Sequence, residues 1–276
     1  MDLDVTEWVG TRVSMSLSSA TAVVQFFNPP HGYMDEAMEA ELALVLDRLE
    51  HWPQGRVVIL TGRDPGVFIR HYDVKILHKR AQFFLAKGKS FSMDRPVPKG
   101  GIHDCLERID KSPLIFIAAI NGVAMGGGFE LALGCDIRIA ATGAKFGAPE
   151  IKLGWIGGGG MSVLLAEAIG SSNAAMMLMT GDPIDSEKAL NWGLISEVSP
   201  IENLRERANE LAVAIASRAP IAAECAKSNL KAAFSMSRED AINYERDLQV
   251  ICFATEDADE GRAAFKEKRP ANFKKR

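Results

Sequence analysis

A run of three glycines, Gly126–Gly128, stands two residues before Glu130 in the middle of the chain. A buried strand ending before these glycines and a helix beginning after them would leave the first helical amides without internal partners. Glycine lets an acceptor approach such amides closely, and the helix dipole adds positive potential there. A site of this kind can hold an oxyanion or an enolate oxygen. Removing one donor typically costs roughly 2.7–4 kcal/mol of transition-state stabilisation.

Two glutamates are the candidate acid and base. Glu130 lies three residues after Gly127, and positions i and i+3 share one face of a helix, so its carboxylate could lie near whatever the Gly127 amide binds. The alternative is that Glu130 only complements the helix dipole. Glu150 follows Pro149, a pair that often simply opens a turn or a helix. If the two carboxylates meet in an apolar site, their pKa values couple, and they can supply a general acid and a general base. The sequence alone does not show that they meet.

Short apolar runs alternate with segments of helical periodicity through the first two thirds of the chain. The runs predict buried strands, and apolar residues spaced by three and four predict helices. The predicted strands are 22–27, 56–61, 114–120 and 136–141, and the predicted helices are 36–49, 129–133, 163–169 and 185–192. Because the two kinds of element alternate, we expect an α/β fold with mostly parallel strand pairing.

The last third of the chain has almost only helical periodicity. The predicted helices are 203–217, 221–234, 238–254 and 257–267. A boundary near Pro200 would separate an α/β core over residues 1–200 from a helical C-terminal region over residues 201–276. The polar stretch 87–111, which contains two prolines, is expected to be a mobile loop between helical pieces.

Composition narrows the class of protein. The 276 residues are 47% apolar and carry a net charge of −4, which favours neither a nucleic-acid nor a membrane partner. Four cysteines form no CxxC pair and have no histidine at zinc-like spacing, so we expect reduced thiols, no metal and a cytoplasmic protein. The acidic N-terminus lacks the apolar stretch of a secretory signal, and runs such as 114–120 are too short to span a bilayer.

A dense set of motifs runs from the middle of the chain to its end. The segments are AAINGVAMGGGFELA at 118–132, CDIR at 135–138, FGAPEI at 146–151, LG at 153–154, TGD at 180–182, ALNWGLI at 189–195 and EKRPANF at 267–273. Together they resemble the crotonase superfamily, and the enoyl-CoA hydratase branch in particular, over nearly the whole chain. The resemblance implies a spiral of ββα units, followed by a helical region that assembles a homotrimer or a dimer of trimers. It also implies an acyl-CoA substrate and no cofactor beyond that CoA.

The resemblance also implies roles for particular residues. By position, the backbone amides of Tyr72 and Gly127 are the two oxyanion donors, since an amide survives a change of side chain. Glu130 and Glu150 fall on the two glutamates that hydratases use, whereas isomerase branches generally keep one acid. In that role Glu150 protonates the α-carbon, while Glu130 holds the attacking water and helps to deprotonate it.

Three segments depart from the family pattern. His71 replaces the usual glycine of the first oxyanion loop, Gly32-Tyr33-Met34 stands where Asn-Ala-Leu is usual, and Gly157 stands where a proline is expected. The first two segments normally line the CoA channel. The departures therefore suggest an altered substrate, a changed position of the CoA, or a substrate without CoA.

Six further residues are candidates for substrate or CoA contacts. They are Arg70, His71, Lys75, Gly126, Trp155 and Lys268. Lys75 occupies a phosphate-facing position of the family, with a solvated lysine as the alternative, and Arg70 is proposed on its charge alone. His71 is a candidate catalyst, a substrate contact or a space-filling residue. The basic tail 266–276, which contains Lys268, is either a contact to CoA phosphates, within one chain or across a subunit interface, or a solvated chain end.

Three functions compete on these grounds. Hydration of a 2-enoyl-CoA is the leading hypothesis. Another enolate reaction on the same scaffold, namely isomerisation, decarboxylation or C–C cleavage of a non-CoA diketone, is the second, because the same oxyanion hole would serve it. A non-catalytic protein that binds RNA through basic helices is the third. The pair of glutamates and the acidic overall charge argue against this last function.

Overall fold

The computed structural model describes residues 6–88 and 99–276, which contain two sheets. The larger sheet has the order β1-β2-β3-β4-β6-β8-β11, antiparallel from β1 to β3 and parallel from β3 onward. Its strands are β1 Glu7–Val9, β2 Val13–Ser18, β3 Thr21–Phe26, β4 Val57–Gly62, β6 Ile115–Ile120, β8 Ile137–Ala141 and β11 Glu197–Ser199. The expected α/β fold with mostly parallel pairing is confirmed.

The smaller sheet has the order β10-β9-β7-β5, and its strands are β5 Gly66–Ile69, β7 Gly122–Met125, β9 Lys145–Gly147 and β10 Ile184–Asp185. Each of β4, β6 and β8 in the larger sheet is followed along the chain by one strand of the smaller sheet, β5, β7 and β9, and then by helical structure. These three ββα units repeat side by side, so β5, β7 and β9 are parallel neighbours. The periodicity of the sequence did not predict the strands of this second sheet, although the ββα units implied by the family resemblance include them.

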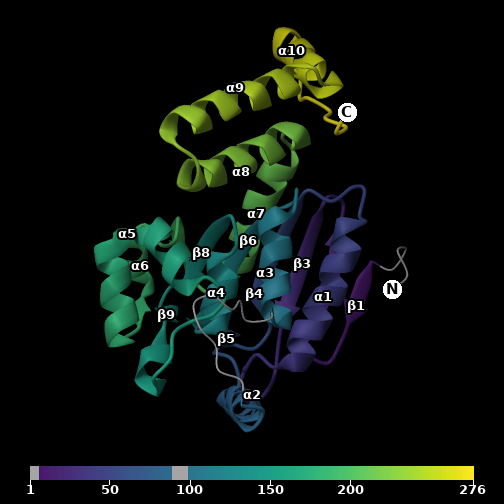
Figure 1. Ribbon diagram of the computed structural model, residues 1–276. Helices are drawn as coiled ribbons and strands as arrows, with labels where there is room; N and C mark the ends of the chain where they lie inside the picture. Colours follow the sequence, from purple (N-terminus) through teal and green to yellow (C-terminus); the bar gives the residue numbers. More distant parts are fainter. Residues whose placement is uncertain (1–5, 89–98) are drawn as a thin grey trace.

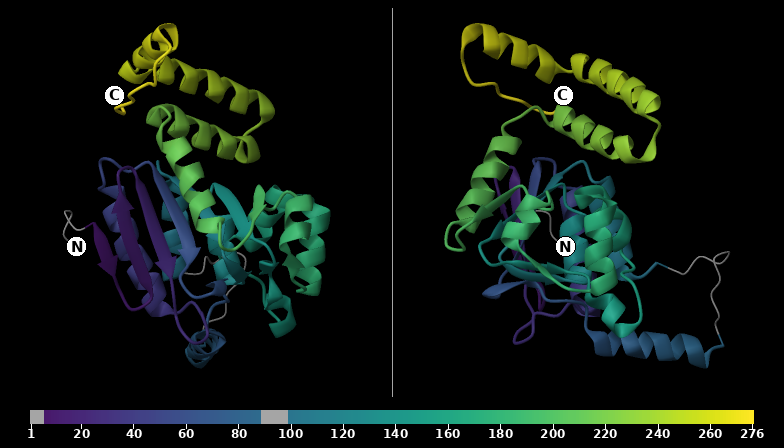
Figure 2. Two further views of the ribbon diagram at one scale, coloured as in Figure 1. Left: turned by 180° about the vertical axis from the view of Figure 1, so that it is seen from behind. Right: turned by 90° about the vertical axis from the view of Figure 1, so that its left-hand side faces the viewer.

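Helices cover both faces of the larger sheet, and Figure 2 shows α7 (Leu204–Ala216) lying across its strands when the molecule is seen from behind. The side chains of Val58 and Leu60 belong to the main core, whereas Val57 and Ile59 belong to a second core beneath α7. Alternate residues of β4 thus face opposite layers. This two-sided burial explains why the central strands read as continuous apolar runs.

Helices α1 (Glu36–Glu50) and α3 (Gly101–Lys111) pack against each other in the main core (Figure 1). The expectation of a mobile loop is wrong for residues 101–111, which form α3. Its buried side chains, Ile102, Cys105, Leu106 and Ile109, follow the spacing of one helix face. The remainder of the expected loop includes residues 89–98, which lie outside the described residues.

The C-terminal helices α8 (Pro220–Ser235), α9 (Arg238–Phe253) and α10 (Glu256–Glu267) extend away from the two sheets (Figures 1 and 2). The predicted helical character of this region is confirmed. The hydroxyl of Ser237 accepts a hydrogen bond from the Asp240 amide at 3.1 Å and so caps α9.

Helix α5 (Met161–Thr180) is the one helix among the described residues that is long and apolar enough to cross a membrane. Its backbone is interrupted at Gly170, where φ is 76° and ψ is 156°, so the segment consists of two helices in succession. Neither piece approaches the roughly 20 residues that a bilayer crossing needs. The first piece packs in the main core through Met161, Leu165 and Ile169.

Candidate active site

Three loops that follow the strands of the smaller sheet converge at one edge of it. Tyr72 comes shortly after β5, Gly127 shortly after β7, and Glu150 shortly after β9. Because β5, β7 and β9 are parallel neighbours, their carboxyl ends lie at the same edge. The repeat of ββα units therefore brings together residues that are far apart in the chain.

The amides of Tyr72 and Gly127 are free to bind a ligand. Tyr72 pairs with Met34 in an isolated parallel bridge, whose hydrogen bonds run from the Met34 amide to the His71 carbonyl at 2.9 Å and from the Asp73 amide to the Met34 carbonyl at 2.8 Å. This pattern leaves the Tyr72 amide outside the bridge. Among the described residues, neither the Tyr72 amide nor the Gly127 amide donates to a protein acceptor. The Cβ of Tyr72 lies 3.7 Å from the point where a Cβ on Gly127 would stand, so the two segments are in contact.

Gly126 is the residue that brings the Glu150 carboxylate against the glycine run. Its φ of 52° lies in the left-handed region, and a Cβ built on it would stand 2.7 Å from Oε1 of Glu150. A side chain here would both strain the backbone and displace the carboxylate. Glu150 itself lies in the short 3₁₀ helix η1 (Pro149–Leu153), and its Oε2 is buried without a hydrogen-bond partner among the described residues.

Glu130 faces a second glycine run, that of residues 157–160. It lies in α4 (Gly127–Leu133) with only 5% of its surface exposed, and its Oε1 accepts a hydrogen bond from the Gly159 amide at 2.7 Å. A Cβ on Gly157 would stand 2.7 Å from the same oxygen. Gly157 therefore lies directly against the Glu130 carboxylate.

The two carboxyl groups share one electrostatic environment. Burial raises the pKa of Glu130, an effect that the hydrogen bond from Gly159 opposes. Burial also raises the pKa of Glu150, and the charge of Glu130 raises it further. A carboxyl group with a raised pKa holds its proton more readily, which is the property that a general acid needs.

Two of the unusual residues form a ring stack beside this site. The imidazole of His71 stacks on Tyr33 with centroids 4.5 Å apart, and Tyr33 stacks on His31 at 5.1 Å. The His71 Nδ1 is 2.7 Å from the Tyr72 carbonyl oxygen, and its Cβ is 3.6 Å from the Cβ position of Gly126. Two departures of the sequence are therefore in contact with each other at the border of the site.

The remaining candidate residues are more dispersed. Arg70 is exposed and donates from Nε to the His31 carbonyl at 3.0 Å, and Lys75 is exposed in the first turn of α2 (Val74–Ala86). Trp155 is half-buried and donates its amide to the Glu150 carbonyl at 3.2 Å. Lys268 follows α10, which lies at the opposite end of the molecule from α2 (Figure 1). Within one chain, only Lys268 is remote from the converging loops.

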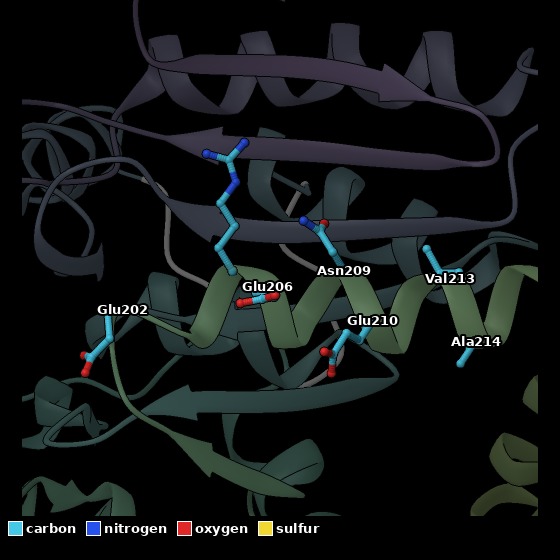
Figure 3. A pocket seen from close by; sticks show the side chains of 7 residues that line it. Glu202, Glu206, Asn209, Glu210, Val213 and Ala214 are labelled. Carbon is cyan, nitrogen blue, oxygen red and sulfur yellow. The ribbon is translucent and has the colours of Figure 1, made fainter.

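An open depression lies elsewhere, along α7 (Figure 3). It is lined mainly by exposed polar side chains of that helix, and α7 covers the face of the larger sheet that belongs to the second core. The two glutamates lie in the other layer. In the parts of the chain that the structure describes, no group of three His, Cys, Asp or Glu side chains could hold a metal ion.

The sequence reasoning overlooked Glu39 and Arg80, which lie against the Tyr72 side chain. A signal for Glu39 was present, since it stands three residues before Leu42 on the apolar stripe of α1. A carboxylate on a buried helix face is unusual and needs a partner. No comparable pattern marked Arg80, which is half-buried on α2.

Comparison with known proteins gives concordant matches. The family model described as enoyl-CoA hydratase/isomerase matches residues 16–276. The mitochondrial enoyl-CoA hydratase of Pongo abelii is 45% identical over 164 residues, which are 59% of this chain and 56% of that protein. This match therefore spans little more than half the length of that relative. The crotonyl-CoA hydratase of Syntrophomonas wolfei is 34% identical over 225 residues, covering 80% of this chain and 81% of that protein.

Solved structures agree with the fold described above. The enoyl-CoA hydratase structure from Bacillus anthracis has a TM-score of 0.87 at 30% identity, over 96% of this chain and all of that one. The structure from Geobacillus kaustophilus has a TM-score of 0.86 at 31% identity, over 98% of this chain and 99% of that one. The spiral of ββα units expected from the sequence motifs is thus confirmed as a crotonase fold.

Proposed function

Because this chain belongs to the enoyl-CoA hydratase/isomerase family, we propose that it is a hydro-lyase that adds water across the double bond of a 2-enoyl-CoA. The observation that carries the proposal is the convergence of two unpaired amides, at Tyr72 and Gly127, beside two carboxyl groups with raised pKa values, one buried at Glu130 and one half-buried at Glu150. The same chemistry is named for the relatives from Pongo abelii and Syntrophomonas wolfei.

In the proposed reaction, the thioester oxygen accepts hydrogen bonds from the Tyr72 and Gly127 amides. These donors stabilise the negative charge that develops on that oxygen as the β-carbon is attacked. The dipole of α4, whose first residue is Gly127, adds positive potential at the same place. Two backbone donors aimed at one oxygen lower the barrier more than they tighten substrate binding, because the charge is larger in the transition state.

The two glutamates divide the proton transfers between them. We assign Glu130 to the water, which it holds and deprotonates as the oxygen adds to the β-carbon. The electron pair of the double bond moves to the α-carbon, and Glu150, in its protonated form, donates the proton there. The raised pKa of Glu150 supports its role as the acid, and the hydrogen bond from the Gly159 amide favours the ionised form of Glu130 that a base needs.

A second candidate is another enolate reaction, on a substrate that does not carry CoA in the usual position. The stack of His31, Tyr33 and His71 supports this second candidate. Tyr33 and His71 belong to the two segments that are expected to line the CoA channel. Calorimetric titration with CoA separates the two proposals. Measurable binding favours the enoyl-CoA substrate, whereas no binding favours the substrate without CoA.

A hydration assay tests the leading proposal. Purified protein mixed with crotonyl-CoA should remove the ultraviolet absorbance of the conjugated thioester. Glu150→Gln should lower kcat at least 100-fold, since a positioned acid or base contributes roughly 10²–10⁴-fold. Glu167→Gln, at an exposed position of α5, is the matched control and should keep the full rate. An unchanged rate in Glu150→Gln would remove that residue from the mechanism, and no turnover of crotonyl-CoA or longer enoyl-CoAs would reject the proposal.

We also propose that the protein is a cytoplasmic homotrimer or dimer of trimers. Large apolar side chains are exposed on all three C-terminal helices, among them Leu230, Phe234, Val250 and Phe265. An apolar surface of this kind is typical of an interface between subunits.

The proposed cytoplasmic location is supported by the cysteines. All four are free thiols, which agrees with a reducing compartment.

A further inference from the structure

A buried carboxylate lies behind the oxyanion loop, away from the two catalytic glutamates. Glu39 in α1 is only 6% exposed, and its Oε1 has no hydrogen-bond partner among the described residues. Its Oε2 is 3.5 Å from Nη2 of Arg80 and 3.0 Å from the point where a Cβ on Gly101 would stand. Burying a carboxylate is costly, so a charge kept at this position requires a reason.

The neighbour of Glu39 is the side chain of Tyr72. The Tyr72 residue is 7% exposed, and its hydroxyl is buried and likewise lacks a partner of good geometry within the described part of the chain. Burial and the adjacent charge of Glu39 raise the pKa of Tyr72, so the hydroxyl stays protonated and is a donor. A buried donor and a buried acceptor therefore stand side by side.

Arg80 completes the cluster from the second helix. Its guanidinium lies over the Tyr72 ring, with Cζ 5.2 Å from the ring centroid, and it pairs with Glu36 at 2.9 Å as well as with Glu39. The Tyr72 ring is thus held between α1, which supplies both glutamates, and α2, which supplies the arginine.

We propose that Glu39 and Arg80 are positioning residues that hold the Tyr72 side chain and thereby aim the Tyr72 amide at the substrate oxygen. The inference rests on the proposed function. The backbone of Tyr72 is fixed on one side by the bridge to Met34 and on the other by Asp73, which caps α2. The side chain supplies a third attachment point, and three points define the orientation of a peptide plane. A donor that is misplaced by about 1 Å can cost 10²-fold in rate.

The test removes the hydroxyl and its acceptor separately and together. Tyr72→Phe, Glu39→Leu and the double variant keep the backbone amide, and Glu39→Gln keeps an acceptor oxygen. Since Arg80 retains Glu36, Glu39→Leu leaves no unpaired cation. We expect Tyr72→Phe and Glu39→Leu each to lower kcat about tenfold with KM within about twofold, because the oxyanion contact strengthens in the transition state. The double variant should lose no more than either single variant, and Glu39→Gln should restore most of kcat.

A spectroscopic readout separates positioning from a purely structural role. The 4-(dimethylamino)cinnamoyl-CoA thioester absorbs at longer wavelength when its carbonyl is polarised, so its red shift on binding reports the oxyanion contact directly. The shift should shrink in Tyr72→Phe and in Glu39→Leu and return in Glu39→Gln. The control is Glu50→Gln, at the end of α1 in an ion pair with Arg108, which should keep the full shift.

Two outcomes would overturn the inference. If the wild-type protein shifts the probe and both single variants match it in shift and kcat, the cluster only stabilises the fold and the inference fails alone. If the wild-type protein neither hydrates enoyl-CoA nor shifts the probe, the proposed function fails and the inference falls with it. Thermal unfolding of each variant verifies that a lost shift does not reflect an unfolded protein.

Discussion

The burial that suits Glu150 to act as an acid also lowers the stability of the folded protein when Glu150 is ionised. The carboxyl group is largely buried, one of its oxygens has no partner in the described residues, and its pKa lies above the ordinary value of 4.5. An acid that must hold a proton near neutral pH needs such an environment. The ionised form is therefore poorly accommodated, and the folded protein carries that cost when the group is charged.

This opposition gives a pH-dependent prediction. A carboxyl whose pKa is raised on folding binds its proton more tightly when folded, so its stabilising contribution is complete below pH 4.5 and is lost as pH rises through the folded value. Glu150→Gln should then be more stable than the wild type near pH 8, by about 0.5–1 kcal/mol for this partly screened group, and should lose that advantage near pH 5. Urea unfolding of both proteins at the two pH values measures the difference. A constant difference at both values would contradict the assigned environment.

Gly157 provides a second residue-scale prediction. A methyl group there would stand 2.7 Å from Oε1 of Glu130 and 2.6 Å from Cβ of Met161. Gly157→Ala should displace the Glu130 carboxylate and lower kcat at least tenfold, because a general base acts only within hydrogen-bond reach of its proton. Gly143→Ala is a control outside the site, where no atom lies within 4 Å of the new methyl group, and it should keep the wild-type kcat even though a φ of 80° disfavours alanine there. If Gly157→Ala kept the wild-type kcat in the hydration assay, the assigned position of Glu130 would be wrong.

Much of the candidate site could be proposed from residue types and their spacing in the sequence. The glycine run before Glu130 indicated an anion site, and the family motifs indicated the roles of Glu150 and Tyr72. The sequence could not predict that Glu39 would lie beneath Tyr72, because α1 and the oxyanion loop meet only in the folded protein. It also could not show that Tyr33 and His71 stack on each other, since 38 positions separate them along the chain.

At the scale of elements, the site depends on repetition. Each ββα unit supplies one loop at the same edge of the smaller sheet, and each loop carries one part of the site. The central strands β4 and β6 were predictable because both of their faces are buried and nearly all of their residues are apolar, whereas β1, β2 and β11 were not predicted. The strands of the smaller sheet have only two to four residues and include glycines such as Gly66 and Gly122, so neither periodicity nor composition marked them.

Helix α3 was wrongly predicted to be part of a loop. Its apolar residues follow one helix face, but charged residues at the remaining positions made the segment look like part of a polar loop. The charges pair with neighbours once the protein is folded. Arg108, for example, reaches Asp47 and Glu50 on α1 at 2.6 and 2.7 Å. The high density of charge in this segment therefore belongs to the exposed face of a helix and not to a loop.

A buried lysine of α8 attaches this helix to the core. Nζ of Lys227 lies 2.8 Å from Oδ2 of Asp136 and 2.8 Å from the Leu114 carbonyl oxygen. Lys227→Met should destabilise the protein by about 3–5 kcal/mol, because it leaves the Asp136 carboxylate buried without its cation. Chemical denaturation measures the change, and Lys231→Met, which removes a mostly exposed pair with Asp110, should cost no more than about 1 kcal/mol. Equal effects of the two substitutions would contradict the anchoring role.

At the scale of the whole molecule, the three C-terminal helices carry apolar side chains that a single chain leaves exposed. Phe265 is 88% exposed, and Leu230 and Val250 are 71% and 66% exposed. If these side chains form the subunit interface, Phe265→Glu should shift the protein toward the monomer. Light scattering coupled to gel filtration gives the mass directly, with Lys266→Gln, which changes the net charge by the same amount, as a control for charge alone. A monomeric wild-type protein would contradict the proposed assembly.

We propose that the loops after β5, β7 and β9 place two amides and two carboxyl groups around one thioester carbonyl. A crystal structure of the Glu150→Gln variant with crotonyl-CoA tests it most directly, because the slowed variant should retain unreacted substrate. We predict that the thioester oxygen lies 2.7–3.1 Å from both the Tyr72 and the Gly127 amide nitrogens, with the enoyl carbons between positions 130 and 150. A thioester oxygen bound away from either amide would contradict the account.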